Sequence, residues 1–452
     1  MSTAQIQVTH HSNRKCKFSE SADLEINGKV LVTPTFASRL KSDGEMRIYN
    51  NVRSSYAPKQ LSAYVVRLLD VGRTLYSSMK STAVSNLGIN QMTLDNKFTP
   101  KSDEKVLLID PALEYLYYTA NMERLAVTPF VSHTVRDYIT KFLNKTKELD
   151  KAKLNGEDGV IGKNLLRETE HTNFWTCVYK DANMRMKLIR DTFNVELKAK
   201  TDVLIPPVPL ITSSHLLDVA IDMNEKSRAF SPALSQDERK CADYFVLKPN
   251  VLKNEHMMST IKEYVSTSES ELTLFKFKNL NLCYENMALE RVAFKSFLME
   301  LSLVSQHFEN KAFGLLESGN QTFPAAFSSF AIVSTGFNLD REDQRKDQKD
   351  IPPFANRYDR TNMIMQDKPT FMKTIENNGH TIPCDCRVCI DNPSIPETDF
   401  IEYNRRAKGH YLLCRELEMT EIINAIEKQE SQMGFEKLLR SSLKNLTDII
   451  PR

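Results

Sequence analysis

Long hydrophobic runs are missing from this sequence. No stretch approaches the roughly 18 uninterrupted apolar residues that a membrane span needs, and residues 1–17 are polar, with no apolar segment typical of a secretion signal. Net charge is nearly absent too, because 60 Lys and Arg side chains face 58 Asp and Glu. The sequence therefore predicts a cytoplasmic protein with no membrane contact, and any contact with nucleic acid must come from a local basic patch.

Glycine and tryptophan are scarce, with 13 and 1 residues among 452, whereas hydrophobic residues make up 41%. These values exclude a collagen-like or disordered chain and are typical of a globular protein. No Gly-x-Gly-x-x-Gly follows an expected strand, which disfavours a dinucleotide-binding fold. Five of the eight cysteines occur singly, and without a secretion signal they are expected to be free thiols: Cys16, Cys177, Cys241, Cys283 and Cys414.

Short, continuously apolar runs recur along the chain and predict parallel strands that are covered on both faces. They occupy residues 29–36, 106–110, 203–205, 244–247, 272–275, 313–316 and 330–333. Between them, apolar residues at spacings of three and four predict helices over 61–68, 131–142 and 294–301. This alternation predicts an α/β fold, either a doubly wound sheet or a (β/α)8 TIM-type barrel whose eighth strand is not located.

Composition also divides the chain. Residues 1–28 are polar and predict a loosely held leader, and 29–350 form the expected barrel, with a Lys-rich polar insertion near 146–200. Residues 340–349 are a dense mixed-charge loop. The Pro-Pro pair at 352–353 then opens a C-terminal region, 351–452, with helical apolar spacing over 419–426 and 435–446.

Three cysteines, Cys384, Cys386 and Cys389, lie within six residues. Their thiols converge only if the backbone turns around a common point, as it does around tetrahedral Zn²⁺. His410 is the expected fourth ligand, at the start of an amphipathic helix, and Cys414 is its competitor one turn later on the same face. A zinc ion with four protein ligands has no open position, so we expect it to stabilise the C-terminal helical subdomain rather than to perform chemistry.

This cysteine pattern with its following histidine resembles the zinc motif of the tRNA-guanine transglycosylase superfamily, whose members exchange guanine for a 7-deazaguanine base. Other segments are similar to the strands and the glycine-containing turn of that family: 33–36, 109–112, 315–321 and 330–335. The resemblance implies a (β/α)8 barrel with a zinc-bearing subdomain over about residues 29–430. Length and the lack of a C-terminal RNA-binding domain make the chain most like the DNA-modifying branch, so the implied partners are DNA rather than tRNA, and a 7-deazaguanine base.

Base exchange requires a carboxylate that attacks the sugar and a second group that moves a proton. Asp110 closes an apolar strand and corresponds to the family's Asp in the base pocket. The family's nucleophilic Asp corresponds to Ser334, and a serine hydroxyl is a poor nucleophile without an adjacent base. Asp340, or Asp343 in the same loop, is then the candidate nucleophile.

Further polar residues are expected at the ends of the barrel strands and are candidates for substrate binding. Lys248 stands where the family has a Gln that recognises the base, and Lys276 follows from the next strand. Glu317, Asn320 and Ser334 complete the set. Each of them also has a structural interpretation, as a solvated loop residue or a helix cap.

Three hypotheses follow. The first is an active zinc-containing enzyme that exchanges bases in DNA, which is favoured, or in tRNA. The second is a catalytically silent relative that binds nucleic acid or forms a homodimer or heterodimer with an active subunit, and Ser334 motivates it. The third is a zinc-stabilised barrel with unrelated chemistry. A second carboxylate within about 7 Å of Asp110 favours the first, because nucleophile and base must reach one small substrate.

Overall fold

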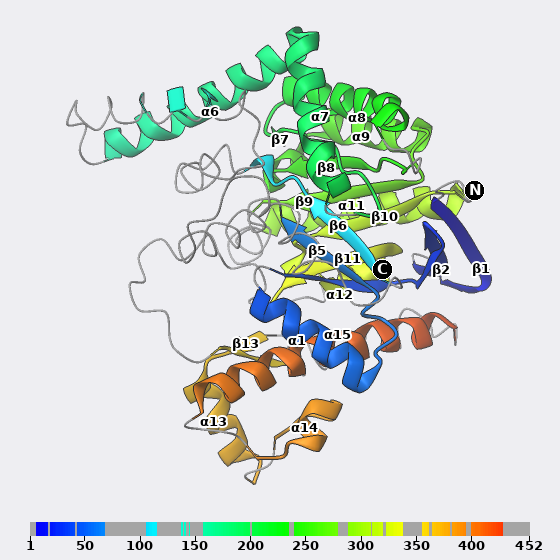
Figure 1. The fold of residues 1–452 in the computed structure, drawn as a ribbon, viewed down its shortest axis with the longest axis vertical. Coiled ribbons are helices and arrows are strands. Elements are labelled where there is room, and N and C mark those ends of the chain that lie inside the picture. Colours follow the sequence, from blue (N-terminus) through cyan, green and yellow to red (C-terminus); the bar gives the residue numbers. More distant parts are fainter. Residues whose placement is uncertain are drawn as a thin grey trace.

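The computed structural model describes residues 6–16, 19–40, 43–67, 105–114, 137–138, 140–141, 144, 157–198, 201–234, 239–278, 288–308, 310–319, 322–337, 355–360, 364–379, 382–394 and 399–427. Its centre is an α/β body with one curled sheet of eight parallel strands, in the order β6-β5-β4-β11-β10-β9-β8-β7 (Figure 1). The strands are β4 (Thr35–Arg39), β5 (Ala63–Arg67), β6 (Val106–Asp110), β7 (Leu210–Ile211), β8 (Asp243–Leu247), β9 (Leu272–Phe277), β10 (Ala312–Leu316) and β11 (Phe330–Gly336). The fold is therefore TIM-like, as predicted.

The segment before β7 links the two edges of this sheet. Val203 forms a parallel bridge to Leu108 in β6, and Leu204 forms one to Cys241, just before β8. Backbone hydrogen bonds accompany both bridges, since Asp202 N donates to Leu107 O and Ala242 N donates to Leu204 O. The predicted strand over 203–205 thus lies between β6 and β8 as a pair of isolated bridges.

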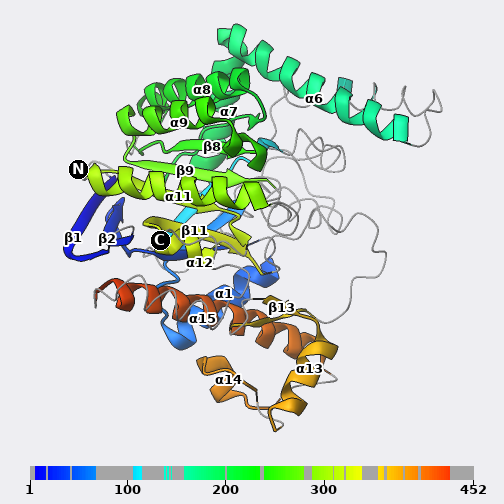
Figure 2. The same ribbon diagram turned by 180° about the vertical axis from the view of Figure 1, so that it is seen from behind.

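Helices cover the outer face of the sheet (Figures 1 and 2). They are α1 (Asp43–Tyr56), α8 (Ser214–Leu234), α9 (Glu255–Thr267), α11 (Ala288–His307) and α12 (Thr322–Phe327), with the 3-10 helix η3 (Pro249–Lys253) after β8. Phe275 of β9 points outward, where its ring contacts Phe297 of α11 at a centroid distance of 5.1 Å and stacks on Phe245 at 5.7 Å. The predicted helix over 294–301 lies within α11.

Two local predictions were wrong. Residues 61–68, predicted as a helix, contain β5, which together with the two-residue β7 was not located from the sequence. A short apolar run fits both periods, and here pairing with β4 and β6 decides in favour of a strand. The single strand predicted over 29–36 is divided into β3 (Lys29–Val32) and β4 by a cis Thr33-Pro34 bond.

The N-terminal segment differs from the loosely held leader predicted for residues 1–28. Strands β1 (Ile6–Cys16) and β2 (Ser19–Ile26) form an antiparallel sheet with β3 beside the barrel (Figure 1). Lys29 anchors this sheet to the barrel, because its Nζ lies 2.7 Å from Asp202 Oδ1 and donates to Lys105 O. The predicted polar insertion near 146–200 holds two helices, α6 (Glu157–Lys180) and α7 (Ala182–Lys198).

The C-terminal region forms a small subdomain at the side of the barrel where α1 lies, and its long helix packs beside α1 and against β4 (Figure 1). It comprises the β12-β13 hairpin (Arg357–Asp359 and Ile364–Gln366), α13 (Lys368–Asn377), α14 (Arg387–Asp391) and the long α15 (Phe400–Glu427). The predicted helix over 419–426 lies in α15, whereas that over 435–446 falls outside the described residues. Among the helices that the structure describes, none is long and apolar enough to cross a membrane.

Strand register decides which side chains face the barrel interior. Phe36 of β4 points outward to Tyr411 of α15, so Arg39, three residues later, points inward. Ser334 is paired with Ala37, which places its side chain on the same inner face. Lys276 alternates with the outward Phe275 and also points inward. The carboxyl ends of the strands therefore direct several charged side chains toward one place.

Candidate active site and metal centre

Four charged residues from three strand ends meet inside the barrel. Asp110 is the last residue of β6, Glu114 follows four positions later, Lys276 lies in β9, and Glu317 follows β10. One oxygen from each of the three carboxyl groups lies within 4.8 Å of the others. We call these four residues the mouth cluster. Its side chains are at most 8% exposed.

Lys276 is the cation at the centre of the mouth cluster. Its Nζ lies 2.5 Å from Asp110 Oδ2, 2.5 Å from Glu114 Oε1 and 3.1 Å from Glu317 Oε1. Burial would favour the neutral amine, but the three carboxyl groups outweigh it and raise the pKa of Lys276 well above its usual value. The ammonium group occupies the place where the three carboxyl groups would otherwise hold a metal ion, so the mouth cluster is an ion-pair network.

Glu317 lies among cations. Arg39 Nη1 is 2.9 Å from its Oε1, and Arg67 Nη1 is 3.7 Å from the same oxygen. Burial alone would raise the pKa of Glu317, but Lys276, Arg39, Lys278 and Arg67 together hold it well below the usual value. Glu317 is therefore a carboxylate at neutral pH.

Glu114 experiences the opposite balance. Its carboxyl group is fully buried, and this desolvation raises its pKa despite the nearby Lys276, while Asp110 raises it further. Two carboxyl groups that share one lysine are thus shifted in opposite directions, Glu317 toward the ionised form and Glu114 toward the protonated form. Such a split is typical of sites that use one carboxyl group as an acid and another as a base or nucleophile.

Asp110 is held in a fixed orientation by two donors. The Tyr244 hydroxyl of β8 and the backbone N–H of Ala112 both donate to its Oδ1, each at 2.9 Å. Ala112 and Glu317 both have left-handed backbone, with φ of 56° and 53°. Such conformations are unfavourable for residues other than glycine and concentrate at functional sites. Here they place Glu114 and the Glu317 carboxylate against Lys276.

The other predicted residues lie as follows. Ser334 is fully buried in β11 and faces the interior, and its Oγ has no hydrogen-bond partner among the described residues. Lys248 follows β8 and is close enough to the buried His171 of α6 to help lower the pKa of that histidine to about 3, after the larger effect of burial. Asn320, Asp340 and Asp343 lie outside the described residues.

Three residues of this site were not predicted from the sequence: Glu114, Arg39 and Arg67. Each arginine is the last residue of its strand, in the position that marked Asp110 as a candidate, so the same criterion would have found Arg39 and, once β5 was located, Arg67. Glu114 lies in the loop after β6, and only its position one turn beyond Asp110 signals that it returns to the same place. The predicted second carboxylate near Asp110 is present twice, as Glu114 and Glu317.

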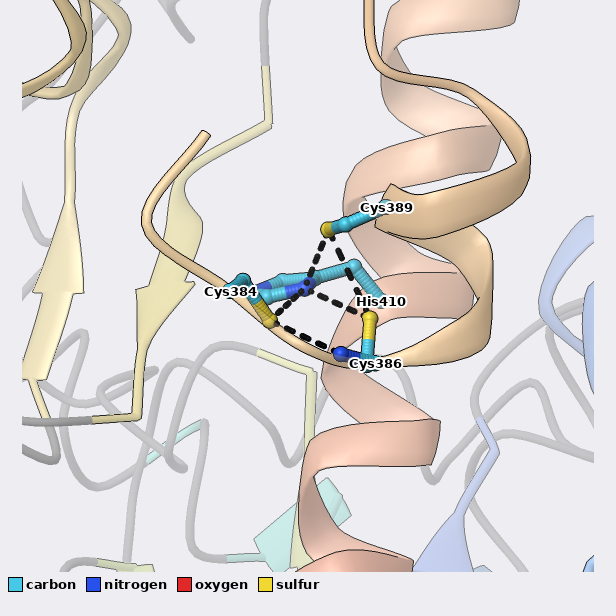
Figure 3. Close-up of side chains that lie close together, drawn as sticks. All are labelled: Cys384, Cys386, Cys389 and His410. Atoms are coloured by element: carbon cyan, nitrogen blue, oxygen red, sulfur yellow. Dashed lines mark hydrogen bonds between the residues drawn. The ribbon is translucent and has the colours of Figure 1, made fainter. Parts of the chain in front are cut away.

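The second cluster consists of the predicted metal ligands Cys384, Cys386, Cys389 and His410 (Figure 3). Cys384 and Cys386 precede α14, Cys389 lies in it, and His410 projects from the middle of α15. The Nδ1 atom of His410 lies 3.5, 3.2 and 3.2 Å from the three sulfur atoms, in sequence order. Four ligands of one tetrahedral zinc are roughly 3.5–3.8 Å apart, so these groups fit a single ion.

Neighbouring groups hold these ligands in place. His410 Nε2 donates to the Tyr358 carbonyl at 2.6 Å, which leaves the Nδ1 lone pair for the three thiols. Arg357 Nη2 donates to Cys389 Sγ at 2.8 Å, and Cys386 N donates to Cys384 Sγ at 3.4 Å. The donors favour thiolates, as metal binding requires. His410 was expected at the start of a helix, but α15 begins ten residues earlier, at Phe400.

Searches with protein-family models and among curated proteins found no match to this chain. The resemblance to transglycosylases therefore depends on the motifs described above, and the function has to be argued from the two clusters.

Proposed function

We propose that this chain is a base-exchange transglycosylase that replaces guanine by a 7-deazaguanine derivative through a covalent sugar-enzyme intermediate. DNA is the favoured substrate and tRNA the alternative. The position of the mouth cluster supports this proposal, because it lies at the carboxyl ends of the strands, where TIM-barrel enzymes have their active sites. For this purpose we take the segment from the bridges at Val203 and Leu204 through β7 as a single strand, the fourth of a closed (β/α)8 barrel.

The observation that carries the proposal is the group of three carboxyl oxygens within 4.8 Å, with opposite pKa shifts on Glu114 and Glu317. Enzymes that form a covalent sugar intermediate have their two carboxyl groups roughly 5–5.5 Å apart, whereas direct displacement by water needs roughly 6.5–9.5 Å. The short separation favours the covalent route. Lys276 makes it feasible to bury the three groups together, because its charge offsets their mutual repulsion.

In the first half of the proposed reaction, a Glu317 carboxylate oxygen attacks C1′ of the sugar. The bond from C1′ to N9 of guanine breaks, and the Glu114 carboxyl proton passes to the leaving base. In the second half, the Glu114 carboxylate takes the N9 proton of the incoming base, whose N9 then attacks C1′ and breaks the ester bond to Glu317. Both residues end in their starting forms.

Asp110 has a different role in this proposal. Both of its oxygens are engaged, Oδ1 by Tyr244 and Ala112 and Oδ2 by Lys276, whereas the cations around Glu317 contact only its Oε1, so Asp110 is assigned to recognition of N–H groups of a purine and Glu317 to attack. The resemblance assigns the matching Asp to the base pocket. Arg39, Arg67 and Lys278 add positive charge at the same strand ends, which supports an anionic polymer as substrate.

The Cys384, Cys386, Cys389 and His410 cluster is proposed to bind structural Zn²⁺. Three thiols and one imidazole are the donors that zinc prefers, and the His410 tautomer set by Tyr358 directs a lone pair to the same point. Zinc in this place would join the segment before α14 to α15. Elemental analysis of the purified protein should find one zinc per chain, and Cys389→Ser should lose it.

Incorporation of a labelled 7-deazaguanine base tests the function. Wild type should transfer label into guanine-containing DNA, with tRNA tested in parallel. Glu317→Gln should abolish this transfer, and its denaturing gel should show no nucleic acid bound to the protein. Asp340→Ala is the matched test of the nucleophile first expected from the sequence. If Asp340→Ala is inactive and Glu317→Gln retains activity, the nucleophile is misassigned.

A catalytically silent relative is the second candidate, and one observation favours it. Ser334 stands at the expected nucleophile position, and its buried hydroxyl has no described partner that would activate it. Such a protein would bind nucleic acid or pair with an active subunit. Wild type that binds DNA or tRNA but transfers no label into either would support this candidate and overturn the first.

A further inference from the structure

A fifth metal-binding group lies against the cysteine-histidine centre. Cys414 follows His410 by one turn of α15 and is fully buried. Its Sγ lies 3.8 Å from Cys384 Sγ and 3.5 Å from His410 Nδ1. Zinc accepts four protein ligands in a structural site, so one of these five groups remains outside the coordination sphere at any time.

The sulfur of Cys414 lies next to the sulfur of Cys384 and next to His410, although it is outside the group of four ligands. Two thiolates on one tetrahedral zinc lie roughly 3.8 Å apart, as the sulfur atoms of Cys384 and Cys414 do. From His410 Nδ1, the sulfur atoms of Cys384 and Cys414 are equally distant, at 3.5 Å each. The sulfur of Cys414 also lies 3.7 Å from His410 Nε2, and Cys414 is not among the four residues whose ligand atoms lie within 4.8 Å of one another, so its side chain must rotate toward Nδ1 before it can replace Cys384.

Charge and exposure indicate which ligand is exchanged. If Cys414 replaced His410, a fourth thiolate would be buried, and within the described part of the chain only the Arg357 guanidinium donates to a ligand sulfur. If it replaced Cys384, three thiolates and one imidazole would remain and the charge would not change. Cys384 is also the one ligand of the four that is partly exposed, whereas the other three are buried.

We propose that Cys414 is a reserve ligand of the metal centre, which takes the place of Cys384 when the Cys384 thiolate is withdrawn or blocked. The inference rests on the proposed metal binding at this centre. It gives the centre a way to keep its metal when its most accessible ligand is modified, because the replacement thiol is buried beside it.

Co²⁺ binding by the full-length chain tests this proposal, because the intensity of the thiolate-to-cobalt absorption scales with the number of bound thiolates. Wild type and Cys414→Ser should both bind one Co²⁺ with three thiolates. Cys384→Ser should also bind one Co²⁺ with three thiolates, now through Cys414. The double variant Cys384→Ser/Cys414→Ser should bind Co²⁺ more weakly than wild type. The loss should be at least roughly 10–100-fold, which is what removal of a supporting group costs.

Cys389→Ser/Cys414→Ser is the matched control, because it removes one of the buried ligands together with the reserve thiol, and it should bind as weakly as the Cys384→Ser/Cys414→Ser variant. Cys384→Ser that binds as weakly as the double variant, or shows two thiolates, would overturn the reserve-ligand proposal. So would loss of a thiolate band in Cys414→Ser alone. Wild type that binds no Co²⁺ or Zn²⁺ would instead overturn the proposed metal centre itself.

A second measurement needs no variant. Iodoacetamide treatment of the metal-loaded wild type should alkylate Cys384 before the buried cysteines, as peptide mass mapping would record, while one metal per chain is retained. Release of the metal in step with Cys384 alkylation would contradict the proposal even if every serine variant failed to fold.

Discussion

At the scale of single residues, Lys276 is the group on which the mouth cluster depends. Replacing it by Met leaves three carboxyl groups buried without their shared cation, and breaking a buried ion pair in this way costs about 3–5 kcal/mol. Urea unfolding of Lys276→Met should show that loss. Lys262→Met is the matched control, because Lys262 is half-exposed and its pair with Glu300 is 3.9 Å long, so its stability should change by less than about 1 kcal/mol.

Glu317 predicts a pH dependence of stability. Its pKa is held well below the usual 4.5 in the folded protein, so the unfolded chain binds its proton first as the pH falls. The ionised Glu317 therefore stabilises the fold above pH 4.5, and this stabilisation is lost as the pH falls from there toward its folded pKa. Unfolding free energies measured from pH 7 down to 3 should fall less steeply in Glu317→Gln than in wild type. Equal slopes in the two proteins would contradict the assignment of Glu317 as an ionised, cation-bound carboxylate.

At the scale of elements, close approach of strands limits what β10 can contain. A Cβ atom on Gly314 would lie 2.5 Å from Leu274 Cδ2 of β9 and 3.5 Å from Ile332 of β11. Gly314→Ala should therefore destabilise the protein by about 1–3 kcal/mol, the usual cost of overpacking a core. Gly409→Ala in α15 is the control, since its Cβ would meet Val52 and Val388 at 3.4 and 3.5 Å. Thermal unfolding should show no loss there, because alanine favours a helix by about 1 kcal/mol relative to glycine.

The elements also show how far the sequence could be interpreted. Apolar runs located β6, β8, β9, β10 and β11 because each of these strands is buried on both faces, and cysteine spacing located the metal centre because its ligands are chemically distinctive. β5 was missed, since a run as short as Ala63–Arg67 fits a helical and a strand period equally well. Glu114 and the pairing of Arg39 with Glu317 depend on contacts between distant segments, and no local pattern encodes them.

At the scale of the whole molecule, the metal centre is expected to hold the C-terminal subdomain against the barrel. α15 carries His410 to the cysteines, and its Tyr411 packs on Phe36 of β4 at a centroid distance of 6.1 Å. Removing the metal with a chelator should increase hydrogen exchange in β12, α13, α14 and α15 while the barrel strands stay protected. Uniform loss of protection would mean that barrel and subdomain unfold as one unit.

The central claim is that Glu317 forms the covalent bond to the sugar, and its most direct test is the mass of the peptide that contains Glu317. Wild type incubated with guanine-containing DNA and then quenched in acid should yield this peptide with an added base-free deoxyribose phosphate after nuclease digestion, and the adduct should disappear when a 7-deazaguanine base is added. Glu317→Gln should yield no adduct. A wild-type protein that transfers label while its adduct maps to another residue, such as Asp110 or Asp340, would contradict the account.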